Sequence, residues 1–81
     1  MKLRVKLFAV ARELVGRDAL EVEVPGGATV ADVRAAVEKN FPALGRVLPH
    51  AQWAVDAEYA DQHTVIREQC DVAIIPPVSG G

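Results

Sequence analysis

Hydrophobic and charged residues alternate in two early segments of the chain, residues 2–8 and residues 19–24. A period of two is typical of a strand that buries one face. Between these segments, residues 10–15 have a helical pattern that stops at Gly16, a residue that often ends helices. We therefore predict two strands, connected through a helical turn and paired as a hairpin.

A longer helix is predicted over residues 30–40. It follows the turn sequence Pro-Gly-Gly at residues 25–27, and Thr29 is a favourable N-cap with Asp32 in the place of a capping-box acid. The Phe41-Pro42 step ends it. One side of this helix is apolar and is expected to pack on a sheet; it carries Val30, Val33, Ala36, Val37 and Phe41.

The second half of the chain predicts further strands. We expect one at residues 52–57 around Trp53, a short edge strand near Tyr59 or at 64–66, and a last strand at 72–75, with one short turn in residues 43–48. This order predicts a single α+β domain over residues 1–81. Its layout is the ubiquitin-like β-grasp, with one main helix packed across a mixed sheet of four to five strands.

Two apolar residues lie on strand faces that should be exposed to solvent. Phe8 continues the charged side of the first strand, and Ile75 lies opposite the buried side of the last strand. If these strands are neighbours, as the layout requires, the two residues form an exposed apolar patch. Such patches usually mark a surface for a partner protein.

Composition excludes several classes of function. The net charge of −2 lacks the basic excess that nucleic-acid binding needs. No apolar run is long enough for a membrane helix, and no signal-peptide pattern is present, so we expect a cytoplasmic protein. Cys70 is the only cysteine, which forbids an internal disulfide. His50 and His63 lack metal-ligand spacing, so no metal is expected.

The end of the sequence carries the candidate chemistry. After the last predicted strand come Pro76, Pro77, Val78, Ser79, Gly80 and Gly81. Proline fixes its backbone, whereas glycine has no Cβ and passes through narrow spaces. A tail that begins with restricted prolines and ends in glycines without side chains suits insertion into another protein. We therefore expect the carboxylate of Gly81 to be the reactive group and residues 76–80 to thread it into a partner's active site.

Two segments resemble the small subunit of molybdopterin synthase. These are Leu-Phe-Ala at residues 7–9 with Arg-Glu-Leu-Val-Gly at 12–16, and the ending Val-Ala-Ile-Ile-Pro-Pro-Val-Ser-Gly-Gly at 72–81. The resemblance covers the whole chain. It implies that an activating enzyme uses ATP to adenylate Gly81, that sulfur replaces AMP to give a thiocarboxylate, and that this sulfur is donated to cyclic pyranopterin monophosphate.

The resemblance also implies partners and contacts. The large subunit would supply the catalytic groups in a heterotetramer, so this chain would bind no cofactor of its own. Phe8, Tyr59 and Ile75 match positions that contact the large subunit. Two places depart from the family pattern: Asp56 replaces a frequent Asn, and Glu-Gln-Cys at 68–70 replaces a frequent Asp-Gly-Asp turn.

Other functions remain open on the sequence. A related carrier could serve thiamine or tRNA thiolation, although the double proline argues against the thiamine type. A ubiquitin-like modifier would instead join Gly81 to target lysines, and a plain binding module would have an idle tail. Cys70 is interpreted as an incidental turn residue, since no partner motif for a nucleophile accompanies it.

Overall fold

The computed structural model describes residues 1–77, and the predictions made for Val78, Ser79, Gly80 and Gly81 fall outside them. The strands of the described part are β1 (Lys2–Leu7), β2 (Ala19–Glu23), β3 (Gln52–Val55), β4 (Glu58–Ala60) and β5 (Val72–Ile75). Its helices are α1 (Ala9–Val15) and α2 (Val30–Asn40), with two short 3-10 turns, η1 (Pro42–Leu44) and η2 (Leu48–His50). No helix within residues 1–77 is long and apolar enough to cross a bilayer.

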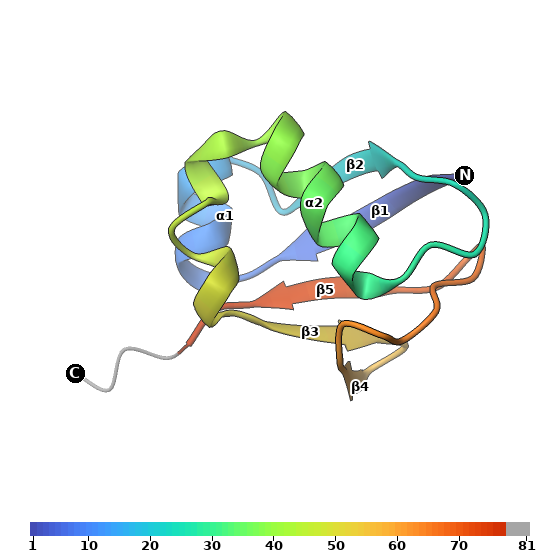
Figure 1. The fold of residues 1–81 in the computed structure, drawn as a ribbon. Coiled ribbons are helices and arrows are strands. Elements are labelled where there is room, and N and C mark those ends of the chain that lie inside the picture. The colour runs from blue at the N-terminus through green and yellow to red at the C-terminus, as the bar shows by residue number, and fades with distance from the viewer. Residues whose placement is uncertain (78–81) are drawn as a thin grey trace.

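The five strands formed by residues 1–77 make one sheet in the order β2-β1-β5-β3-β4. β1 pairs antiparallel with β2 and parallel with β5. The direct pairing of β1 with β5 confirms that the first and last strands are neighbours. In Figure 1, α2 crosses one face of this mixed sheet, while α1 and the 3-10 turns cover one end. The architecture is therefore the predicted β-grasp.

The core lies between the sheet and α2. The alternation in β1 is confirmed, since Leu3, Val5 and Leu7 are buried and the charged residues between them are exposed. Val33 and Val37 of α2 are fully buried against this face. Burial of such side chains contributes about 1.5–3 kcal/mol each to folding. The apolar alternation of the sequence is thus what holds helix and sheet together.

The start of α2 and the end of α1 follow the sequence expectations. The Thr29 hydroxyl accepts a hydrogen bond from the Asp32 amide at 3.4 Å, and the Asp32 carboxylate accepts one from the Thr29 amide at 2.9 Å. This reciprocal capping box fixes the start of α2. At the end of α1, Gly16 has a φ of 79° and donates its N–H to the Arg12 carbonyl at 2.8 Å. A left-handed residue without a Cβ ends the helix there at little cost.

The structure decides between the two expected positions of the short edge strand and confirms the one near Tyr59. The edge strand of the sheet lies at Glu58–Ala60, and residues 64–66 do not belong to the sheet. Instead Val65 forms an isolated bridge with Thr29, and the Ile66 amide bonds to the Ala28 carbonyl at 2.8 Å. Ile66 is buried. These backbone contacts and the buried Ile66 side chain therefore hold the loop against the start of α2.

Two boundaries also differ from the predictions. β3 ends at Val55 and not at residue 57, because Asp56 and Ala57 have φ values of 51° and 68° and reverse the chain. Residues 43–48 were expected to hold one short turn before Pro49, but η2 includes Pro49 within its first turn. Proline is compatible with that position, since its missing N–H would have no helical partner there.

The β3–β4 turn gives a testable stability prediction. Two central residues with positive φ make a type I′ turn, for which glycine is favoured at the second position, here occupied by Ala57. Since the left-handed region costs an L-residue about 1–2 kcal/mol, Ala57→Gly should raise the free energy of unfolding by about 0.5–1 kcal/mol after the added chain entropy is subtracted. Denaturant unfolding would measure this.

A matched substitution on α2 gives the control. Ala35 is exposed in the helix interior, where the same Ala→Gly change should lower stability by about 1 kcal/mol. Opposite signs for the two variants would attribute the effect to backbone conformation. A loss of stability in Ala57→Gly would contradict the type I′ assignment.

Candidate functional site

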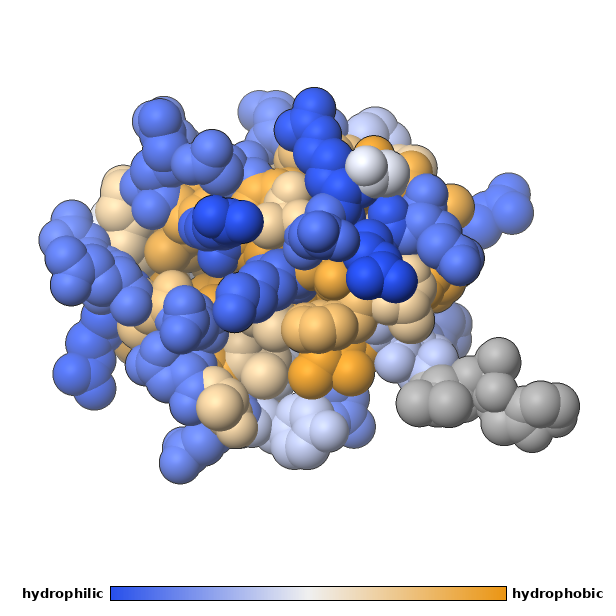
Figure 2. Space-filling view, turned by 180° about the vertical axis from the view of Figure 1, so that it is seen from behind, coloured by the Kyte–Doolittle hydropathy of each residue, from blue (hydrophilic) through white to orange (hydrophobic). Residues whose placement is uncertain are grey.

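An apolar hollow of about 550 Å³ lies on the sheet face turned away from α2. Figure 2 shows this face, where an open area of apolar residues is surrounded by hydrophilic side chains. The hollow is lined by residues of β1, β3, β4 and β5 and of the segments that follow them. Its apolar lining consists of Phe8, Ala54, Ala57, Tyr59, Val72, Ala73 and Ile75. The three interface residues expected from the sequence therefore meet in one place.

The pairing of β1 with β5 brings Phe8 to Ile75. The parallel register sets Leu7 opposite Ile74, so the next residues of the two strands are adjacent at the same end of the sheet. Phe8 is 46% exposed, a large value for a phenylalanine in so small a protein. The chain turns sharply after it, because Ala9 has a φ of 50° before α1 continues. This turn leaves the Phe8 ring at the rim and not under α1.

Tyr59 reaches the hollow from the edge of the sheet. It lies on β4 opposite Ala54 of β3, and the register places Ala54 opposite Ala73 of β5 on its other side. The Tyr59 side chain is 74% exposed. Small alanines at the centre and larger rings at the rim produce the concave shape. Ala54 was missed as a site residue, although the alternation around Trp53 already assigns it to the outer face.

Asp56 and Asp71 connect the β3–β4 turn to the start of β5. The Asp56 amide donates to the Asp71 carbonyl at 2.8 Å, and the Asp71 amide donates to the Asp56 carboxylate at 2.9 Å. An asparagine has the same acceptor oxygen, so the departure at this position preserves the contact. Gln69, which stands where the family pattern often has glycine, has a φ of 65°, a left-handed conformation that glycine adopts more readily.

The candidate tail begins at the end of β5, next to the hollow. Pro76 is buried and Pro77 is exposed, so the described chain leaves the domain surface between them. A proline cannot donate to the sheet ladder, which explains why β5 stops at Ile75. Because β5 runs parallel to β1, the tail starts at the end of the sheet that also carries Phe8.

The remaining candidate residues do not gather into a site. His50 ends η2, His63 lies exposed in the β4–β5 loop, and the Cys70 thiol accepts a hydrogen bond from the Arg67 amide at 3.3 Å. Among residues 1–77, no three His, Cys, Asp or Glu side chains are arranged to hold a metal ion. The described candidate site is therefore the apolar hollow beside the first residues of the tail, and its role as a partner surface stays a prediction.

Known proteins resemble this chain in sequence and in fold. Residues 5–81 match the model of the ThiS family. The chain is 35% identical over 81 residues to the molybdopterin synthase sulfur carrier subunit of Arabidopsis thaliana, with 100% of this chain and 84% of the relative covered. The corresponding subunit of Chlamydomonas reinhardtii is 34% identical over 83 residues, with both chains covered completely. The crystal structure of SAMP1, the small archaeal modifier protein 1 of Haloferax volcanii, has a TM-score of 0.88 at 32% identity and full coverage of both chains.

Proposed function

The chain belongs to the ThiS family of ubiquitin-like sulfur carriers, and from this membership we propose that Gly81 carries the sulfur as a thiocarboxylate. The acceptor we propose is cyclic pyranopterin monophosphate, which receives the sulfur on the way to molybdopterin. In this role the chain is a co-substrate that delivers an atom. The larger subunit of the synthase provides the catalytic groups.

The proposed chemistry follows from the poor reactivity of a carboxylate. Its charge is delocalised, and oxide is a poor leaving group. An activating enzyme therefore joins the Gly81 carboxylate to the α-phosphate of ATP and releases pyrophosphate. A sulfur nucleophile then attacks the acyl carbon and displaces AMP, which leaves the thiocarboxylate. ATP is consumed by the activating enzyme, and this chain needs no bound cofactor.

One observation carries the proposal: the apolar hollow and the root of the tail are adjacent. Phe8 and Ile75 lie at the end of the sheet from which Pro76 and Pro77 continue. A protein that docks on Phe8, Tyr59 and Ile75 is thereby placed next to the segment that leads to Gly81. Docking and insertion of residues 76–81 then become a single event, which suits a carrier that must visit an activating enzyme and a synthase in turn.

The proposal is tested by the intact mass of the protein. Incubation with ATP, a sulfur source and cell extract should add the mass difference between one sulfur and one oxygen atom. Fragmentation should assign this gain to Gly81. An unchanged mass, under conditions that convert an established sulfur carrier, would contradict the proposal.

A ubiquitin-like modifier is the second candidate, and the similarity to the small archaeal modifier protein favours it. The same adenylate of Gly81 would then be attacked by a lysine amine, which gives an isopeptide bond. Conjugates would appear as bands of higher mass that survive denaturant. A carrier for thiamine or tRNA thiolation would show the mass gain but would not support molybdopterin formation with the large subunit.

A further inference from the structure

The outer edge of β2 is a free strand edge on the opposite side of the sheet from β4. β2 is the terminal strand of the sheet that residues 1–77 form, and its one strand partner there is β1. Among residues 1–77, no backbone hydrogen bond connects Ala19–Glu23 to another segment on the outer side. A free edge presents unpaired N–H and C=O groups and is a template for another strand.

The register identifies the groups that point outward. The Leu7 amide bonds to the Asp18 carbonyl at 2.8 Å, and the Val24 amide bonds to the Met1 carbonyl at 2.9 Å. In an antiparallel pair the hydrogen-bonded positions alternate, so Leu20 and Val22 also turn their backbone groups toward β1. The N–H and C=O groups of Ala19, Glu21 and Glu23 therefore face the free edge.

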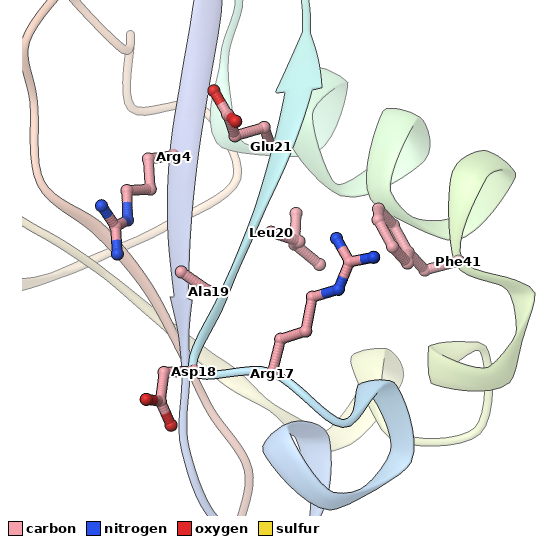
Figure 3. Close-up of a pocket in the computed structure, with 7 residues that line it drawn as sticks. All are labelled: Arg4, Arg17, Asp18, Ala19, Leu20, Glu21 and Phe41. Atoms are coloured by element: carbon pink, nitrogen blue, oxygen red, sulfur yellow. The ribbon is translucent and has the colours of Figure 1, made fainter.

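A groove of about 520 Å³ follows this edge. Figure 3 shows that Leu20, Arg17 and Phe41 lie on the helix side of β2, while Arg4 and Glu21 project on the other side. Leu20 is buried and Phe41 is half-buried, so these two residues give the helix side of the groove an apolar floor, with the exposed Arg17 side chain between them. A strand added here would place alternate side chains over this floor and beside the acidic residues of the outer face.

β1 already shows which sequence pairs well with β2. It sets Lys2 opposite Glu23 and Arg4 opposite Glu21, with apolar Leu3 and Val5 between them. Neither glutamate is engaged in an ion pair within the described part of the chain, so both carboxylates are available on the other side. Cross-strand pairs of opposite charge favour pairing.

We propose that the free edge of β2 is a docking site for an extended segment of another protein in which basic and apolar residues alternate. The backbone groups of Ala19, Glu21 and Glu23 would bind its main chain, and Glu21 and Glu23 would pair with its basic side chains. Its apolar residues would cover Leu20 and Phe41. This surface is separate from the hollow at Phe8 and from the tail, so a protein bound there leaves both free.

A second copy of this chain is a poorer occupant of the same edge. Two β2 strands paired antiparallel about a two-fold axis at Glu21 or Val22 place Glu21 opposite itself or opposite Glu23 of the other copy, whereas an axis at Leu20 pairs only residues 19–21 of each strand. Like charges directly opposite each other destabilise a strand pair. The acidic residues thus oppose self-association while they attract a basic strand.

The test uses the full chain labelled with ¹⁵N and a synthetic peptide, Lys-Leu-Arg-Val-Lys-Leu, that repeats the sequence of β1. With millimolar peptide, the amides of Ala19, Glu21 and Glu23 should shift and exchange more slowly with solvent. The amides of Leu20 and Val22, already bonded to β1, should change less. Higher salt should weaken binding. A peptide with glutamate at the three basic positions should not bind.

Variants of β2 separate the contributions of its backbone and of its charged side chains to peptide binding. Glu21→Pro removes one outward N–H without removing a bond to β1, and it should abolish the shifts. The Glu21→Gln/Glu23→Gln double variant, which keeps the backbone, should weaken binding about three- to tenfold, since each cross-strand charge pair contributes modestly. Glu58→Gln on β4, an exposed glutamate at the other edge, is the matched control and should bind normally.

Three results would overturn the proposal. These are absence of shifts at residues 19–23 with the basic peptide, equal shifts with the acidic peptide, and concentration-dependent shifts at these amides without any peptide. The last result would assign the edge to a second copy. Since Gly81 is not involved, both glutamine variants should still gain sulfur, which distinguishes failure of this site from failure of the proposed function.

Discussion

Deletion of Gly81 is expected to abolish thiocarboxylate formation and sulfur transfer while leaving the fold intact. The deletion removes the carboxylate at the position that we propose the activating enzyme adenylates. The buried core of the described part ends at Ile74, and Gly81 lies well beyond it in the sequence. The free energy of unfolding should therefore change by less than about 0.5 kcal/mol. Intact mass measures sulfur loading, and thermal unfolding measures stability.

Matched glycine substitutions refine this prediction. Gly80→Ala adds a Cβ in the segment that we propose enters a narrow active site, and it should block sulfur transfer. Gly26→Ala makes the same chemical change in a turn where a Cβ would meet no atom within 4 Å, and it should retain full transfer. If the Gly81-deleted protein still accepted sulfur, the reactive group would lie elsewhere. A large fall in melting temperature would show that the end of the chain supports the fold.

Replacement of Phe8 by arginine is expected to weaken binding of the large subunit strongly. The ring is 46% exposed, so the domain itself should fold normally. In the complex the arginine would lie beside Lys6, whereas the two carboxylates of the hollow, Asp56 and Asp71, lie at the opposite end of β5. An unpaired charge buried in an interface is costly, and loss of a hot-spot aromatic contact typically costs about 2 kcal/mol or more, which is about 30-fold in affinity. Calorimetry with the purified large subunit would measure it.

Val65 provides the control for this variant. It is 55% exposed, is also apolar and does not line the hollow. Val65→Arg should therefore leave affinity for the large subunit unchanged, whereas Ile75→Arg should behave like Phe8→Arg. If all three variants bound the large subunit with equal affinity, the hollow would not be part of the proposed interface. If only Val65→Arg lost affinity for the large subunit, the interface would instead lie on the β4–β5 loop.

The secondary structure was largely predictable because its determinants are local. Alternation in residues 2–7 and the capping residues Thr29 and Asp32 act within a few positions of the chain, and the structure follows them. The end of β3 was misplaced because the backbone there adopts a conformation unusual for the residue type. Asp56, Ala57 and Gln69 have positive φ without being glycine, so composition does not mark their turns. Tertiary contacts stabilise these turns, among them the hydrogen bonds between Asp56 and Asp71.

The sequence by itself determined which side chains could be buried and where the candidate chemistry lies. The alternation along the first and last strands assigned Phe8 and Ile75 to the outer face of the sheet. The order of residues 76–81 pointed to a tail with a reactive end. These conclusions need only the spacing of neighbouring residues. They do not depend on which strands pair.

The tertiary structure alone decided which outward residues meet. Phe8 and Ile75 are far apart in the chain and become adjacent through the parallel pairing of β1 with β5. Tyr59 joins them only because β3 lies between β4 and β5. The same strand order leaves β2 with an open edge. Strand order depends on contacts distant in sequence, whereas a periodic pattern records only the face to which each residue points.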